Sequence, residues 1–290
     1  MHGLSQLAAA LCALAVTATA GAAPARVVTL APHATELVYA AGAGDQIVGT
    51  VTSSDHPEQA RQLPRVGDGI LLNQERLLLL APTHIIAWQR FGAAVPAELL
   101  ANRMNAQMLY SAPRTLRELP AEVKRIGALL GTQAAADRTA AAMLARIDAL
   151  EARHAGREPV RVFIEVGSLP LYTIGSDPLV NDALRTCGAV NVYGDSVLAA
   201  PKVPVESVLV HDPQLIVAPA REARDTHEVR QRWAEIGLAA ARRGHVHAAD
   251  PDALFRPGPR LIDATEALCS AVDQARADTS DQTATAQGLK

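Results

Sequence analysis

The sequence predicts an α/β protein made of two related lobes, which one long helix joins and between which a ligand cleft lies. Three observations predict this fold class. Short apolar strands alternate with helices, which is typical of a parallel sheet. A segment of the first half recurs in the second half at a fixed offset. Between the halves lies a long stretch with helical periodicity.

The N-terminal lobe is expected over residues 24–112. A helix is predicted over 34–43, where Gly42 and Gly44 end it, and another over 73–80, which Pro82 stops. The strands of this lobe are predicted from runs rich in β-branched and other apolar residues, at 26–31, 47–51, 84–88 and 107–110.

A helical bridge is expected over residues 113–158. Gly131 and Thr132 divide it into two helices, and the second is predicted from Gln133 to His154. At a rise of 1.5 Å per residue this second helix spans roughly 30 Å, enough to reach from one lobe to the other. A strand at 160–166 then opens the C-terminal lobe, 159–273, and the polar residues 274–290 are expected to form a disordered tail.

The internal repeat is the strongest evidence for two related lobes. Residues 75–87 align without a gap with residues 206–218, and the offset is 131 both for the glutamates (206 − 75) and for the prolines (213 − 82). Ligands of such two-lobed α/β proteins bind at the carboxyl ends of the strands, where the lobes face each other.

The N-terminus resembles a secretion signal, expected over residues 1–23. Residues 4–20 form an apolar run without a charge, and the small residues Ala20, Gly21 and Ala22 follow it. A membrane anchor is the alternative, but the run is slightly short and lacks a flanking basic stop. Lipidation of Cys12 is not expected, because Leu11 precedes it. We therefore expect an exported, periplasmic protein.

Export makes the two remaining cysteines informative. Cys187 and Cys269 form an even pair in an oxidising compartment, which favours a disulfide between them. Two separate buried thiols are the alternative.

Charge and motifs argue against several classes of function. The chain has 27 basic and 30 acidic residues, a net charge of 27 − 30 = −3, and no basic patch, so nucleic acid is not an expected partner. It has no phosphate-binding Gly-rich loop, nucleophile elbow or zinc-protease motif, and no metal-ligand spacing. Residues 53–56 contain Ser, Asp and His but are interpreted as a polar loop. We expect no enzyme; a secreted hydrolase is the alternative from another class.

Two pairs of residues are nevertheless candidates for a binding role. His33 and His56 each follow a predicted strand, in loops that should border the cleft, and either is a candidate ligand contact. Glu75 and Glu206 begin helices that the repeat relates. They either stabilise helix N-termini or project from the outer rims of the lobes as paired docking acids for a two-fold transporter.

The chain resembles the periplasmic substrate-binding proteins of ABC importers, in which one long helix bridges two α/β lobes, and most closely their cobalamin-binding members. The motifs that carry the resemblance lie at 27–49, 53–67, 73–88, 162–175, 181–195 and 255–269. The resemblance implies that the protein captures a corrinoid, with cobalamin as the first candidate. The corrinoid would be a transported ligand, and no cofactor is expected. The resemblance implies delivery by a monomer to an ABC importer permease dimer in the inner membrane. It also implies a Cys187–Cys269 disulfide and docking through Glu75 and Glu206.

The same resemblance implies a cleft lined by Trp88, Phe91, Tyr172 and Phe255. The whole chain has only nine aromatic residues (three Phe, four Tyr and two Trp), and the loops 67–72 and 198–203 lack tryptophans that cobalamin-binding members carry. Haem and a ferric siderophore are therefore alternative ligands. A metal-bearing ligand could be coordinated by His33 or His56, and a siderophore could be held by Arg90 and Arg256.

Overall fold

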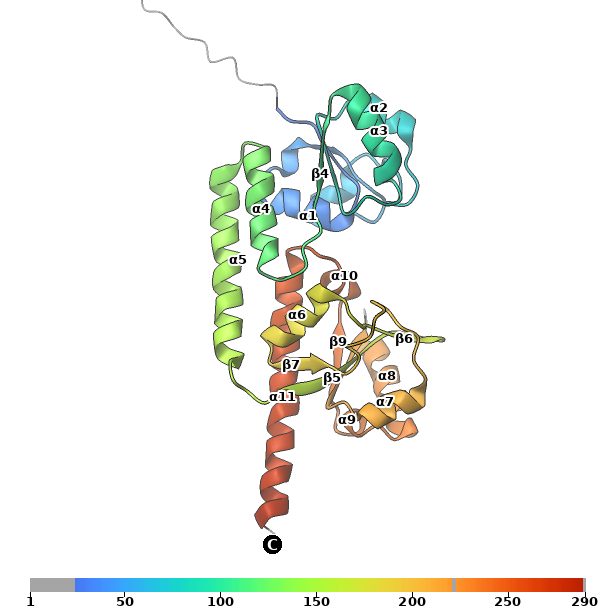
Figure 1. Ribbon diagram of the computed structural model, residues 1–290, viewed down its shortest axis with the longest axis vertical. Helices are drawn as coiled ribbons and strands as arrows, with labels where there is room; N and C mark the ends of the chain where they lie inside the picture. The colour runs from blue at the N-terminus through green and yellow to red at the C-terminus, as the bar shows by residue number, and fades with distance from the viewer. Residues whose placement is uncertain (1–23, 221–222, 289–290) are drawn as a thin grey trace, which may run out of the picture.

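The computed structural model describes residues 24–220 and 223–288 and has the predicted architecture (Figure 1). Two α/β lobes lie one above the other, and helix α5 (Gln133–His154) runs alongside both. The predicted fold class is thereby confirmed. The expected signal peptide and Cys12 lie outside the described residues. Within the described residues, no helix is long and apolar enough to cross a membrane.

The N-terminal lobe contains a four-stranded parallel sheet in the order β2-β1-β3-β4. All four strands were predicted. The last, β4, has the predicted length, and the other three are one to three residues shorter than their apolar runs. The helix of 94–104 was not predicted, and it buries Ala97, Leu100 and Ala101 against the sheet. The elements are β1 (Val27–Thr29), α1 (Pro32–Ala40), β2 (Ile47–Gly49), α2 (Gln74–Leu80), β3 (His84–Ala87), α3 (Ala94–Met104) and β4 (Gln107–Tyr110). Helix α4 (Glu118–Leu129), which follows β4, belongs to the bridge.

The C-terminal lobe is organised around the long strand β5. Its first part pairs with β7 and its last part with the antiparallel β6, while β8 and then β9 extend the sheet on the other side. The elements are β5 (Val160–Ser168), β6 (Leu171–Thr173), α6 (Pro178–Thr186), β7 (Ala189–Asn191), α7 (Val205–His211), β8 (Leu215–Pro219), α8 (Ala223–Ile236), α9 (Ala239–Arg242), β9 (Val246–Ala249), α10 (Pro251–Leu254) and α11 (Arg260–Gly288).

The bridge is a helical hairpin of α4 and α5, which turns at Gly131 in the left-handed region (φ 73°). Helix α5 begins and ends at the predicted residues. Ile126 of α4, Ile147 of α5 and Leu184 of the C-terminal lobe are all fully buried in one hydrophobic cluster. Because a single core runs through both lobes and the bridge, we expect little hinge motion between the lobes.

Helix α11 differs from the expectation for the C-terminus. Residues 274–288 continue this helix instead of forming a disordered tail. Two contacts with the C-terminal lobe hold the extension: Ala275 is fully buried, and Asp278 pairs with Nε2 of His245 at 2.7 Å. The polar composition of this segment concealed these contacts, since only one side of the helix touches the lobe.

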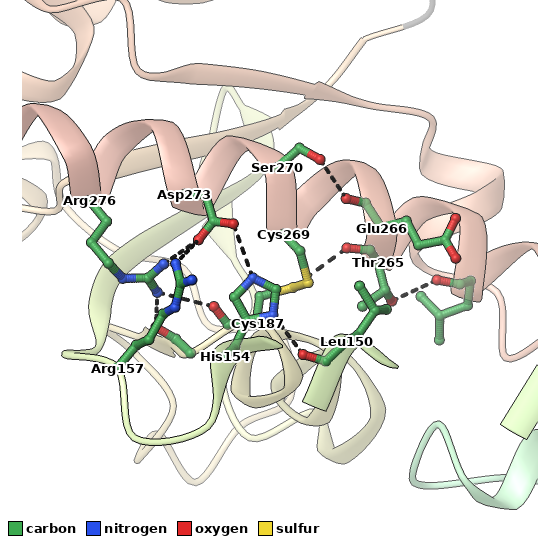
Figure 2. The surroundings of a disulfide bond; sticks show 12 residues. Leu150, His154, Arg157, Cys187, Thr265, Glu266, Cys269, Ser270, Asp273 and Arg276 are labelled. Carbon is green, nitrogen blue, oxygen red and sulfur yellow. Dashed lines mark hydrogen bonds and ion pairs between the residues drawn. A yellow bond between two sulfur atoms is a disulfide. The ribbon is translucent and has the colours of Figure 1, made fainter. Parts of the chain in front are cut away.

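The predicted disulfide is confirmed between Cys187, at the end of α6, and Cys269, within α11. Figure 2 shows the polar cluster beside it. His154, the last residue of α5, contacts a carboxylate oxygen of Asp273 at 3.2 Å through Nε2, and Arg276 pairs with the same carboxylate. The disulfide and this cluster together fasten α11 to both the C-terminal lobe and the end of the bridge.

Candidate ligand-binding cleft

A cavity of about 360 Å³ lies between the two lobes. The N-terminal lobe contributes the residues that follow β3 and β4, because parallel strands bring their carboxyl ends to the same edge of the sheet. The C-terminal lobe contributes the start of α6 and the end of α10. The cavity is lined by Trp88, Gln89, Ala112, Pro113, Arg114, Asp177, Pro178, Leu179, Val180, Leu254, Phe255 and Pro257.

A second, more apolar cavity of about 220 Å³ lies on the N-terminal lobe, where Leu30, Ile70 and Phe91 contribute to its lining. Trp88 lines both cavities and therefore lies at their junction. Its side chain is 49% exposed and that of Phe91 is 69% exposed. Exposed aromatic rings of this size at a cavity are typical of ligand-contact surfaces. The structure thus brings together Trp88, Phe91 and Phe255 around one cleft.

His33 lies beneath Trp88 and does not face the cleft. It is 2% exposed, and its ring meets the Trp88 ring edge to face, with the centroids 5.8 Å apart. Nε2–H donates to the backbone oxygen of Ser111 at 3.2 Å. Burial lowers the pKa of His33 to about 4; the bond to Ser111 opposes this shift and the charge of Arg256 adds to it. The expectation of a ligand contact therefore differs from the structure, in which His33 is a neutral support for Trp88.

The other two predicted contacts lie outside both cavities. His56 is exposed in the loop that follows β2, and Tyr172 is 39% exposed on β6. Neither residue is part of the lining described for either cavity. His56 was expected at the cleft because it follows a strand, and Tyr172 because of the resemblance. Whether either residue reaches the lining depends on loop paths that the sequence pattern does not determine.

Two ion pairs cross from lobe to lobe beside the cavity, and neither pairing was predicted from the sequence. Arg260 of α11 forms a bidentate contact with Glu36 of α1, at 2.8 and 3.1 Å, and the Glu36 side chain is 3% exposed. Arg256 contacts Asp55 at 3.0 Å. Burial raises the pKa of the Asp55 carboxyl, but the hydrogen bond and charge of Arg256 outweigh it, so the net pKa lies below its usual value. These contacts fix the two lobes relative to each other.

A buried cluster of hydroxyl groups holds the loop that carries Asp55. Thr50 Oγ1 donates to Ser54 Oγ at 2.7 Å, and Thr29 and Thr35 lie within hydrogen-bond distance of Thr50, both at 2.8 Å. All four side chains are fully buried. The polar loop of 53–56 is therefore anchored from below through Ser54, while its next residue reaches across to the C-terminal lobe.

The two arginines considered for siderophore binding already have carboxylate partners. Arg90 pairs with Glu98 at 2.8 Å. Arg256 pairs with Asp252 at 2.7 Å in addition to Asp55. Among the described residues, no group of three or more His, Cys, Asp or Glu side chains could hold a metal ion.

Glu75 and Glu206 are both exposed in the first turns of α2 and α7. Figure 1 shows α2 on the side of the N-terminal lobe that faces away from the C-terminal lobe, and α7 on the side of the C-terminal lobe that faces away from the N-terminal lobe. Each helix carries two exposed apolar side chains one turn after its acid: Leu78 and Leu79 on α2, and Leu209 and Val210 on α7.

Comparison with known proteins adds three findings. Residues 27–253 match the model of a family described as periplasmic binding protein. The vitamin B12-binding protein of Vibrio cholerae is 34% identical over 246 residues, covering 84% of this chain and 88% of that protein. The homologue from Pectobacterium atrosepticum is 34% identical over 267 residues, covering 90% and 92%.

Solved structures agree with this. The crystal structure of the periplasmic vitamin B12 binding protein of Vibrio cholerae superposes with a TM-score of 0.77 at 33% identity, covering 87% of this chain and 98% of that chain. A periplasmic heme-binding protein from Roseiflexus superposes with a TM-score of 0.75 at 23% identity, covering 88% and 100%. At that identity the second match reports on the fold alone.

Proposed function

This chain belongs to the periplasmic binding protein family, and we propose that it captures a corrinoid, cobalamin, in the cleft between its lobes. The relatives named as vitamin B12-binding proteins support this ligand. The observation that carries the proposal is the placement of Trp88, an exposed ring at the junction of two cavities. A corrin ring with its side chains is larger than either cavity, so it would lie across Trp88 and extend into both.

The surroundings of Trp88 suit a large ring whose edge is rich in amides. The smaller cavity offers apolar contact through Ile70 and Phe91, and the larger one adds the polar side chain of Gln89 between the lobes. His33 restrains the Trp88 ring through the edge-to-face contact between the two rings, which lowers the entropy lost on binding. Because His33 is neutral and buried, coordination of the ligand's metal by this residue forms no part of the proposal.

We further propose that the protein works in the periplasm and hands its cargo, chemically unchanged, to an ABC importer. Glu75 and Glu206 support this, since the repeat gives each lobe the same exposed acid on the same kind of helix. Two matched acids on two related lobes fit a partner with two-fold symmetry and basic docking sites.

Isothermal titration with cyanocobalamin and, separately, with haemin tests the proposed ligand. We expect one cyanocobalamin per chain, with an affinity well above that for haemin. Saturable binding of haemin without binding of cyanocobalamin would refute the corrinoid proposal. It would also assign the chain to the haem-binding branch of the fold.

A further inference from the structure

We propose that Arg114 is a specificity-determining residue of the cleft, which recognises an anionic phosphodiester at the edge of the ligand. In cobalamin this group joins the nucleotide loop to the corrin ring. The inference rests on the proposed function, and it goes further by separating complete cobalamin from corrinoids that lack the nucleotide loop.

The first observation is the charge of the cavity lining. Arg114 and Asp177 are the charged residues of the larger cavity. The Asp177 carboxylate is already engaged, because one of its oxygens accepts the backbone N–H groups of Leu179 and Val180 at 3.1 and 2.9 Å and caps α6. The side chain of Arg114 is exposed, and its guanidinium has no hydrogen-bond or ion-pair partner among the described residues.

The second observation is that the other arginines of this region are neutralised. Arg90 pairs with Glu98, Arg256 pairs with Asp55 and Asp252, and Arg260 pairs with Glu36. A ligand anion that approaches any of these three would have to compete with a carboxylate already in place. A ligand anion that approaches Arg114 meets no competing carboxylate, so the positive charge of Arg114 is available to the ligand.

The third observation is the rigidity of the loop that presents Arg114. Its own backbone N–H donates to Glu118 Oε2 at 2.6 Å, and the N–H of Leu116 donates to Asp182 Oδ2 of α6 at 2.8 Å. The loop is thus fastened to the bridge on one side and to the C-terminal lobe on the other. A charge presented from a fixed backbone has less freedom to lose on binding than one on a mobile loop.

The chemistry of the guanidinium favours a phosphodiester. Its planar N–H groups match two phosphate oxygens in a bidentate contact, and such charge-assisted bonds are stronger than bonds to neutral groups. The corrin ring of cobalamin is surrounded by neutral amides, so the phosphodiester is the one negative group at the ligand's edge. Gln89 and the backbone of the cleft can serve the amides, whereas Arg114 is suited to the anion.

The test compares cyanocobalamin with dicyanocobinamide, which lacks the phosphodiester and the nucleotide, in titrations of the full chain. We expect Arg114→Gln to weaken cyanocobalamin binding about tenfold and dicyanocobinamide binding less than about twofold. Arg114→Lys should recover part of the loss. The difference should shrink as ionic strength rises, because salt screens an exposed charge pair.

Arg103→Gln is the matched control, since Arg103 is exposed on α3 and lines neither cavity. It should leave both affinities unchanged, and thermal unfolding should show that each variant folds. Equal losses for both corrinoids, or no loss for either, would overturn the role of Arg114 while leaving the proposed function standing. If the wild-type chain binds neither corrinoid, the proposed function fails and this inference fails with it.

Discussion

The helix–strand units α2–β3 and α7–β8 are related by the internal repeat. They are alike where their helices begin and differ where their strands end. Each helix begins with an exposed acid, Glu75 or Glu206, and continues with two exposed apolar residues. Each ends at a left-handed residue before a proline, Ala81 (φ 40°) in one and Asp212 (φ 41°) in the other. Each then leads into a buried strand of the parallel sheet.

The difference begins where the strands end. Trp88 follows β3 and lies at the junction of the cleft cavities, while the matching position 131 residues later is Pro219, the last residue of β8. Pro219 borders a separate cavity of the C-terminal lobe that is lined by charged residues such as Glu165 and Arg232. The outer ends of the two units are thus alike, as the proposed docking on a symmetric partner requires, whereas their inner ends differ, as the proposed binding of one asymmetric ligand requires.

The largest expected effect concerns stability, in which the lobes also differ. Among the described residues, the disulfide is confined to the C-terminal lobe and closes a loop across 82 positions. The double variant Cys187→Ala/Cys269→Ala should lower the free energy of unfolding by ~4 kcal/mol, because the unfolded chain regains entropy. Urea unfolding monitored by circular dichroism measures this. A loss below about 1 kcal/mol would show that helix packing alone holds α11.

The second effect concerns the diverged strand ends. Trp88→Ala should weaken cyanocobalamin binding by roughly 30- to 150-fold, since a central aromatic contact contributes about 2–3 kcal/mol. The repeat supplies the matched control, Pro219→Ala, which should change the affinity less than about twofold. Equal losses in the two variants would contradict the asymmetry of the cleft.

The third effect concerns pH and the support of Trp88. The pKa of His33 is 6.5 in an ordinary environment and about 4 in the fold. The folded chain resists protonation of this ring, so the corresponding stability is present above pH ~6.5 and is lost as pH falls toward ~4. Between pH ~7 and ~5 the free energy of unfolding should fall by about 2 kcal/mol more than in His33→Gln, whose side chain does not titrate. Parallel pH profiles of the two proteins would show that His33 is accessible to solvent.

The smallest effect distinguishes the starts of the repeated helices. Asn73 Oδ1 accepts the backbone N–H of Arg76 at 2.9 Å and caps α2, whereas Pro204 precedes α7 without a side-chain cap. Asn73→Ala should therefore cost about 1 kcal/mol in urea unfolding. Pro204→Ala removes no side-chain cap and serves as the comparison. An Asn73→Ala change without a measurable cost would place the stability of α2 in its buried Leu77 instead.

The features that could be predicted from the sequence are those that local pattern determines. Apolar periodicity predicts both ends of α5 to the residue, and the 131-residue repeat relates α2–β3 to α7–β8 in the sequence itself. The location of the cleft between the lobes was also predicted, because the carboxyl ends of parallel strands meet at one edge of a sheet. The disulfide was predicted because two cysteines remain after the expected signal peptide and the expected compartment is oxidising.

The remaining features depend on contacts between distant residues. Glu36 and Arg260 are 224 positions apart, and Asp55 and Arg256 are 201 apart, so no spacing rule links them. His33 shows the same limit. Its position after a strand suggested the cleft, but whether its ring faces solvent or lies beneath Trp88 depends on packing that only the folded chain defines. The end of α11 was missed because a polar helix with one buried side resembles a disordered segment.

We propose, in sum, that the matched outer acids dock on the transporter and that the diverged inner strand ends bind the ligand. Uptake of labelled cyanocobalamin by cells that depend on this protein, measured beside the affinity of the same variant, tests it most directly. Glu75→Arg/Glu206→Arg should retain wild-type affinity and abolish uptake. Glu158→Arg/Glu235→Arg, which makes the same charge change at exposed acids on neither α2 nor α7, should preserve both. Loss of affinity in the first double variant, or uptake at the wild-type rate, would contradict the account.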